Sequence, residues 1–492
     1  KNLILIVIMG ILFILPILRY NALNSTIFDL GVFQHQVYNL SIYGFGFGHF
    51  QVFQPFYHMF YSEYFLIISQ SFLVLSPIYF IYKLGNEQKT FLVTIYLLCY
   101  AVWYNVLFDF HFDHISILFM MMFYYFIREG KYKSAFFISI MVSLIKEPFA
   151  LVTSFMGLYL IIKSRQYIKG SILFVYGFFY FYLTINYIIP SFTPEYIQVG
   201  SDTFSSFGNG GGLLNIMLYP ITHFQEFIIE IITTKKLIYL IALFSAFGLV
   251  IVFFSPLELI PAIPPLAIAL LSNVENHYWY NTHYTAPLIA PFMVAFIFGL
   301  PKLILFCKRK IKYLNTTKKI LIVVFIPVIF SHILFSPSPI SRFFWINKLP
   351  QYHHTTYIST ERTQKIKEAI LKYIPSDEKI SIASQNSLHW EYLSRREYFF
   401  SFPQGVLTET NINYTTSNNF IDIFNHITGE DTSIIHTKKI KVDFIIIDMK
   451  RPFYLIDKYA NRIEFTNKIE KMQIDYSIIY KYDDFYIFKL NK

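Results

Sequence analysis

The sequence is poor in charge and in cysteine. Only 15% of its 492 residues are charged, against about 25% in a typical soluble globular protein. This deficit excludes an ordinary soluble enzyme, and a hydrophobic fraction of 55% excludes a disordered chain. The two cysteines, Cys99 and Cys307, lie far apart in apolar stretches, which excludes a disulfide framework. The C-terminal part also lacks a glycine-rich phosphate loop, a CxxC pair and a nucleophile elbow.

Long apolar runs dominate the first 337 residues. About 18 apolar residues are enough to cross a hydrocarbon core of roughly 30 Å as a helix. We expect eleven spans, several of them short: Asn2–Leu18, Glu63–Tyr82, Thr90–Leu107, Ile115–Ile127, Tyr132–Ile145, Phe149–Ile162, Ile168–Pro190, Leu237–Ser255, Leu257–Leu271, Tyr284–Leu300 and Ile320–Pro337. The first run is expected to be a retained span, because no small-residue cleavage site follows it.

The positions of Lys and Arg predict the orientation of these spans. Cytoplasmic loops of membrane proteins are enriched in basic residues. If the N-terminus is cytoplasmic, sixteen basic residues before residue 338 lie inside and four lie outside, namely Arg19, Lys146, Lys235 and Lys236. The sequence therefore predicts a multi-pass membrane protein with a cytoplasmic N-terminus, and the family resemblance given below implies the plasma (inner) membrane. This topology also gives the net charge of +10 a role in orientation, so that no nucleic-acid partner is expected.

The acidic residues and histidines show the opposite asymmetry. With this topology, all nine histidines before residue 338 and ten of the thirteen carboxylates lie in outer loops or at outer span ends. Titratable groups near a membrane are costly unless they are paired or hydrated. Their distribution favours a polar cavity that opens outward, although the positive-inside rule alone also leaves acids and histidines free to accumulate outside.

Residues 338–492 are expected to form a soluble extracytoplasmic α/β domain, distinct from a transmembrane domain at 1–337. Their pattern predicts a helix over 361–373, strands over 379–383 and 398–400, a helix over 387–393, a buried strand over 442–448 and a terminal hairpin around Asp483 and Asp484. Asp448, at the end of the buried strand, is either a site residue or the cap of a turn.

Two segments offer acids or bases near the predicted outer surface. Asp29 follows the first span and is a candidate general base for an acceptor hydroxyl; the alternative is an N-cap for the next helix. Lys146 is a candidate contact for a phosphate, and Glu147 for its partner or a second acid or base. A plain ion pair at a helix break made by Pro148 is the competing explanation.

Other clusters could bind a metal or a phosphate. In the segment FDFHFDH, Asp109, His111 and Asp113 alternate with aromatics and would share one face of an extended chain, with donors that suit Mn or Zn; a solvated loop anchored by phenylalanines is the alternative. The segment ENHYWYNTHY contains His277 and His283, whose spacing is not specific for a metal. His49, His58 and Glu63 flank the second span in the same way.

Several of these segments together resemble a known family. They are FDLGVFQHQVYN at 28–39, His49-Phe50, FDFH at 108–111, LIKEPFALV at 144–152, HYTAPLIAPF at 283–292, the section 373–403 and VDFIIID at 442–448. In this order they resemble a predicted polytopic membrane family of unknown function, which is similar to the GT-C class of membrane glycosyltransferases.

Kinship with the GT-C class implies an enzyme that takes a sugar from a polyprenyl-phosphate donor and attaches it to an acceptor on the outer face. It implies a carboxylate in the first outer loop, which maps onto Asp29, and short outer helices parallel to the membrane near residues 28–42. Some members bind a divalent metal, here Mn, Mg or Zn. GT-C enzymes often have an acidic pair near this loop, whereas Asp29 has no adjacent acid.

We therefore expect a glycosyltransferase-like membrane enzyme. Asp29 and Glu147 are its candidate acids or bases, Lys146, His49, His58 and His283 its candidate donor contacts, and Asp109, His111 and Asp113 its candidate metal ligands. Its expected partners are membrane lipids and the polyprenyl-phosphate sugar, with the C-terminal domain a candidate surface for another membrane protein. The alternatives are a noncatalytic subunit or scaffold of a larger assembly and a lipid or solute transporter.

Overall fold

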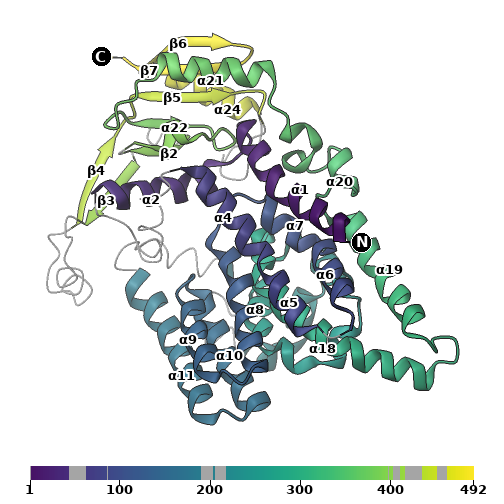
Figure 1. The fold of residues 1–492 in the computed structure, drawn as a ribbon. Helices are drawn as coiled ribbons and strands as arrows, with labels where there is room; N and C mark the ends of the chain where they lie inside the picture. Colours follow the sequence, from purple (N-terminus) through teal and green to yellow (C-terminus); the bar gives the residue numbers. More distant parts are fainter. Residues whose placement is uncertain are drawn as a thin grey trace. The chain divides into compact units, whose positions relative to one another are not determined.

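The chain divides into two compact units in a computed structural model (Figure 1). The structure describes residues 2–43, 62–85, 87–189, 203–204, 218–396, 398–402, 410–415, 435–451 and 462–491. The first unit comprises Lys1–Phe13, Gln70–Phe108 and Phe112–His353, and the second comprises Ile14–Ser69, Asp109–His111 and His354–Lys492. The domain boundary expected at residue 337 stays a prediction.

The first unit is built from helices. Helices α1 (Asn2–Asn21) and α4 (Glu63–Leu75) each belong partly to both units. The other α-helices of this unit are α5 (Pro77–Leu84), α6 (Lys89–Leu98), α7 (Tyr100–Leu107), α8 (Ile115–Arg128), α9 (Tyr132–Ser143), α10 (Pro148–Ser164), α11 (Tyr167–Leu183), α15 (Phe224–Ile231), α16 (Thr234–Ala246), α17 (Ile263–Leu271), α18 (Ala286–Lys310), α19 (Thr317–Phe335) and α20 (Arg342–Trp345). Short 3-10 or π turns connect them: η3 (Phe112–His114), η4 (Thr184–Ile188), η5 (Ile251–Phe254), η6 (Pro256–Ala262), η7 (Glu275–Tyr278), η8 (His283–Thr285) and η9 (Pro350–Tyr352).

Five helical segments in the described part of the chain are long and apolar enough to cross a membrane. They are Leu3–Asn21, Glu63–Leu84, Tyr167–Ile188, His283–Lys310 and Thr317–Phe335. The bent pair α6 and α7 gives a sixth if it is one span, and three further apolar helical segments, Tyr132–Ser143, Pro148–Ser164 and Pro256–Leu271, are shorter. The chain is thus a mostly helical membrane protein with five to six candidate spans, and the count of eleven stays a prediction.

The run expected as one span over 90–107 contains a break. Helices α6 and α7 meet at an angle of 56°, and Cys99 between them has an extended backbone with φ −65° and ψ 118°. The carbonyls before the break find side-chain donors, because Trp103 Nε1 donates to Leu97 at 2.7 Å and His332 Nδ1 lies 2.7 Å from the Leu98 oxygen. A break in an apolar helix is stable when neighbouring groups satisfy the freed carbonyls in this way.

The second unit contains a mixed five-stranded sheet. Its strands are β1 (Ile382–Ser384), β2 (Phe399–Ser401), β5 (Phe444–Asp448), β6 (Tyr476–Tyr482) and β7 (Phe485–Leu490), in the order β2-β1-β5-β7-β6. Strands β2, β1 and β5 are parallel, and β7 and β6 continue the sheet antiparallel. Strands β3 (Thr410–Thr415) and β4 (Ile435–Ile440) form a separate antiparallel pair. The other elements are η1 (Ile27–Gly31), α2 (Val32–Tyr43), η10 (His354–Tyr357), α21 (Glu361–Tyr373), α22 (Glu391–Ser394) and α24 (Arg462–Met472).

Both faces of this sheet are covered. Phe444 and Ile446 of β5 pack in one apolar core with Ile366 and Ile370 of α21, whereas Ile445 and Ile447 point into a second core that includes Met472 of α24. A strand buried on both faces has a continuous apolar sequence, which explains the run FIIID.

The small C-terminal α/β fold confirms several expectations. The predicted helix has the bounds Glu361–Tyr373, and the terminal hairpin turns at Asp483 and Asp484, whose φ values are 47° and 62°. The helix expected over 387–393 is limited to the single turn of α22.

Candidate functional site

The loop after α1 places Asp29 in a tight π-helical turn. Thr26 is extended and precedes η1, and the Gly31 amide closes the turn by donating to the Thr26 carbonyl at 3.1 Å. Asp29 lies within this turn, and Thr26 takes the N-cap position. Asp29 is therefore held beside the start of the next helix. Its side chain is half-buried and so remains partly accessible.

The hydroxyl of Thr26 brings two carboxylates together. Its Oγ1 lies 3.1 Å from Asp29 Oδ2 and 2.7 Å from Asp109 Oδ2. A hydroxyl has one proton to donate, so Thr26 donates to one carboxylate at a time and thereby couples the two acids. The acidic partner that Asp29 lacks in the sequence is thus Asp109, which lies 80 residues further along the chain.

The two carboxylates differ in their surroundings. Asp109 is 7% exposed, and its Oδ2 also accepts from the Thr26 amide at 2.8 Å and from Arg19 Nη2 at 3.2 Å. The guanidinium of Arg19 and the amide of Thr26 thus supply hydrogen bonds to this buried carboxylate. Asp109 therefore anchors the loop, and Asp29 is the more accessible acid of the pair.

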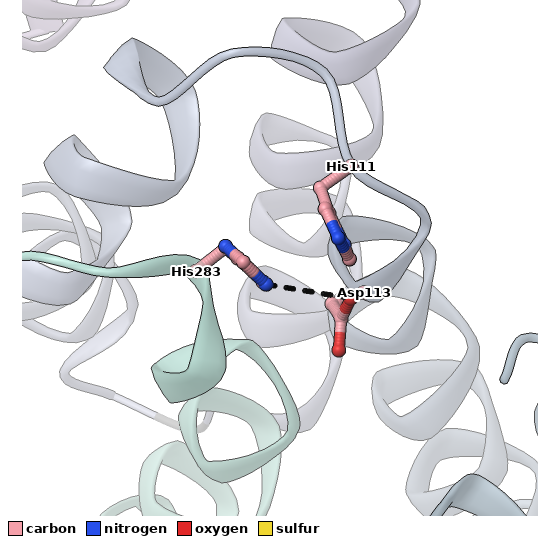
Figure 2. A group of neighbouring side chains, drawn as sticks. All are labelled: His111, Asp113 and His283. Carbon is pink, nitrogen blue, oxygen red and sulfur yellow. Dashed lines mark ion pairs between the residues drawn. The ribbon is translucent and has the colours of Figure 1, made fainter. Parts of the chain in front are cut away.

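Asp113 and His283 form a second polar group, in the helical unit. His283 Nε2 lies 3.9 Å from Asp113 Oδ2, and both side chains are buried (Figure 2). Figure 2 also shows His111, two residues before Asp113; one ligand atom from each of the three side chains lies within 4.8 Å of the others. Ligands of one ion at bond lengths of 2.0–2.2 Å lie roughly 3–4.4 Å apart, so small side-chain shifts would bring these donors around a metal.

Lys146 lies near this group, at the start of α10. Its Nζ is 5.6 Å from the ring centroid of Tyr284, whose ring in turn lies 4.2 Å from that of His283 and 4.5 Å from that of His277. The pKa of His277 is lowered from 6.5 to about 4, chiefly by partial burial and also by the charge of Lys146, while Asp113 opposes the shift. His277 is therefore neutral near neutral pH, with the positive charge of Lys146 close to it.

The contacts of the other residues predicted for the site say less about their roles. Glu147 takes the N-cap position of α10, before Pro148, without a side-chain capping hydrogen bond. Glu63 is buried and its Oε1 lies 2.6 Å from His389 Nε2. His49 and His58 lie outside the described residues. The assignments of Asp29, Glu147, Lys146, His283, Asp109, His111 and Asp113 to catalysis, donor binding or a metal stay predictions.

Sequence reasoning did not include Thr26 and Arg19 in the site. Arg19 carried a usable signal, because it is a cation at the predicted outer end of an apolar span, where basic residues are rare. Such a residue is expected to have a buried acidic partner, and the structure provides Asp109. Thr26 carried no comparable signal, since its role depends on a contact between segments far apart in the sequence.

Fold and sites together define a polytopic membrane protein with clustered acids and histidines. The chain belongs to the family described as "Predicted membrane protein (DUF2079)", whose model matches residues 49–434. No curated protein matches the chain. Among solved structures, it is similar to the oligosaccharyltransferase of Archaeoglobus fulgidus in the apo form, with 11% identity and a TM-score of 0.40 over 91% of this chain and 69% of that one.

Proposed function

We propose that the protein is a glycosyltransferase-like membrane enzyme that transfers a sugar from a polyprenyl-phosphate donor to an acceptor on the outer face of the plasma membrane. The observation that supports this proposal most directly is the pair Asp29 and Asp109 around the Thr26 hydroxyl. Thr26 and Asp29 follow the first apolar helix in the chain, and in this proposal that end of the helix is where a lipid-linked phosphate is presented.

In this proposal Asp29 is the general base. It takes the proton from the acceptor hydroxyl while that oxygen attacks the anomeric carbon of the donor sugar, and the bond from this carbon to the phosphate oxygen breaks. A general base must be reachable by the substrate, and Asp29 is half-buried whereas Asp109 is buried and bound by Arg19. Asp109 and Thr26 hold the base in place.

The group around His283 is proposed to receive the phosphate end of the donor. Lys146 offers a positive charge, and His277 and His283 offer imidazole nitrogens close to it. Together these groups would stabilise the negative charge that grows on the departing polyprenyl phosphate.

The donor set at His111, Asp113 and His283 fits a divalent metal. Two imidazoles and one carboxylate suit Mn or Zn better than Mg, which prefers oxygen ligands. These three residues would hold the ion, and the ion would supply positive charge beside the phosphate.

The proposal is tested by Asp29→Asn. Removal of the base should lower the rate of transfer at least about 100-fold, measured with purified protein in lipid and a panel of radiolabelled polyprenyl-phosphate hexoses with envelope extract as acceptor. The matched control is Asp377→Asn, which changes an exposed aspartate of the α/β fold and should leave the rate unchanged. If Asp29→Asn transfers sugar as fast as the unaltered protein, Asp29 is not the base.

A further inference from the structure

The loop that carries Asp29 is part of the core of the C-terminal fold. Leu23 and Ile27 are 0% and 1% exposed and pack in the same apolar cluster as Ile366 of α21 and Phe444 of β5. Burial of two such apolar side chains stabilises the contact between the loop and this core. The loop is therefore fixed by the C-terminal fold, although more than 330 residues separate them in the sequence.

Polar contacts hold the backbone of this loop from the C-terminal side. The amides of Ile27 and Phe28 donate to the main-chain and side-chain oxygens of Asn386 at 2.9 and 2.8 Å. Asn24 Nδ2 donates to the Thr356 carbonyl at 2.7 Å. These contacts fix both sides of Thr26, the residue that joins Asp29 to Asp109.

One arginine binds the strained part of the loop. Leu23 has φ 60°, a backbone conformation that is unfavourable for a side chain of its size. The guanidinium of Arg451 donates to the carbonyl of Leu23, to Asn24 Oδ1 at 2.8 Å and to the Ser387 carbonyl at 3.2 Å. Three acceptors on one guanidinium nitrogen make Arg451 the link between this backbone and the sheet.

Arg451 is itself held by the buried Asp448 at the end of β5. Asp448 Oδ2 accepts from Arg451 Nε at 3.0 Å, and Arg362 binds the same carboxylate through two nitrogens at 2.9 and 2.8 Å. Asp448 Oδ1 also accepts from the Lys450 amide at 3.1 Å. Asp448 thus caps a turn, as one reading of the sequence expected, and it also orients the arginine that reaches the loop.

We propose that Arg451, held by Asp448, is a positioning residue that sets the place of the Asp29 carboxylate. The inference rests on the proposed role of Asp29 as the base. This role of Arg451 makes the C-terminal fold a part of the catalytic machinery, because a residue of that fold keeps the strained turn at Leu23 in place.

The test compares Arg451→Gln with Lys450→Gln in the full-length protein. Lys450 is the adjacent residue, but its ammonium pairs with Asp483 of the β6–β7 turn. Hydrogen exchange of the peptide covering residues 22–31 should become about tenfold faster in Arg451→Gln, since charged hydrogen bonds are lost, and should stay unchanged in Lys450→Gln. Unchanged exchange in Arg451→Gln overturns the proposal.

Kinetics separate positioning from general stability. In Arg451→Gln, kcat should fall about tenfold or more with the same polyprenyl-phosphate hexose, whereas KM should change little, because a displaced base affects the reaction more than binding. Faster exchange with an unchanged kcat overturns the positioning role. If Arg451→Gln does not fold, the milder Arg451→Lys keeps the positive charge but lacks the forked donors of the guanidinium, and the same two changes are expected. Full activity of Asp29→Asn together with faster exchange in Arg451→Gln contradicts the proposed function alone.

Discussion

The ion pair of Arg19 and Asp109 shows how neighbouring groups stabilise buried charge in this protein. Both side chains are almost fully buried, and the Thr26 amide and hydroxyl supply further donors to the carboxylate. Burial of a charge is tolerated only when its partners replace the lost water. The effect of this pair on the stability of the protein is therefore expected to be greatest when only one of the two side chains is removed.

Arg19→Met should be strongly destabilising, because it leaves the Asp109 carboxylate buried without its cation. The expected cost is about 3–5 kcal/mol, measured as a lower unfolding temperature of the protein in detergent. Asp109→Asn should also destabilise the protein, and the double variant should lose less than the sum of the two single losses. Additive losses in this cycle would show that the two side chains do not interact.

The neutral state of His277 predicts a dependence of stability on pH. Its pKa is about 4 in the folded protein, against 6.5 for an ordinary histidine, chiefly because its ring is partly buried. The unfolded chain therefore binds this proton first, and the stabilisation is complete above pH 6.5 and is lost as the pH falls towards 4.

His277→Gln should make the unfolding temperature fall less steeply between pH 7 and about 4.5 than it does in the unaltered protein. Glutamine has an ordinary hydrogen-bonding side chain and no proton to gain in this range. The exposed His223 provides the control, and His223→Gln should follow the unaltered protein. Parallel curves for His277→Gln and the unaltered protein would contradict the burial of a neutral His277.

At the scale of elements, the sequence predicted the structures that depend on nearby residues. It did not predict contacts between residues that lie far apart in the chain. The helix over Glu361–Tyr373 has an amphipathic pattern and a cap at Thr360, and the hairpin has Asp483 and Asp484 at its turn, so both follow from nearby residues. The break at Cys99 depends on His332, which comes from α19. No local pattern could predict that partner, and the same is true of Thr26 between Asp29 and Asp109.

The hairpin of α10 and α11 packs through glycines. A Cβ atom at Gly157 would lie 2.5 Å from the Gly170 carbonyl oxygen and 2.7 Å from the Phe174 nitrogen. Gly170 meets the backbone of α10 in the same way, with a Cβ atom 2.7 Å from the Gly157 oxygen. Small residues let membrane helices approach closely, and these glycines explain why two apolar helices lie side by side here.

Gly157→Ala should lower the unfolding temperature, because the added methyl group forces the backbones of α10 and α11 apart at a cost of about 1–3 kcal/mol. Gly10 is a matched control in α1, since a Cβ atom there meets nothing within 4 Å. Gly10→Ala should leave the unfolding temperature equal or higher, because alanine favours a helix. A similar response of both variants would contradict close packing through Gly157.

At the scale of the whole molecule, the proposed function depends on the side of the membrane on which each part of the chain lies. Many of the basic residues before residue 338 lie in the segment from the end of α18 to the start of α19, which contains Lys308, Arg309, Lys310, Lys312, Lys318 and Lys319. We expect this segment on the cytoplasmic side and the C-terminal fold on the other. Tyr313 and Ile474 are well suited to a comparison, since each is 81% exposed.

Cysteine labelling in right-side-out vesicles tests this orientation. In a background without Cys99 and Cys307, both of which are buried, a membrane-impermeant maleimide should label Ile474→Cys in sealed vesicles and should label Tyr313→Cys only after the membrane is opened. Because the two positions have equal exposure, a difference in labelling reports the side of the membrane and not local burial. The opposite pattern would place the C-terminal fold in the cytoplasm, and Asp29, which that fold holds through Leu23 and Ile27, would then face cytoplasmic substrates instead of an outer acceptor.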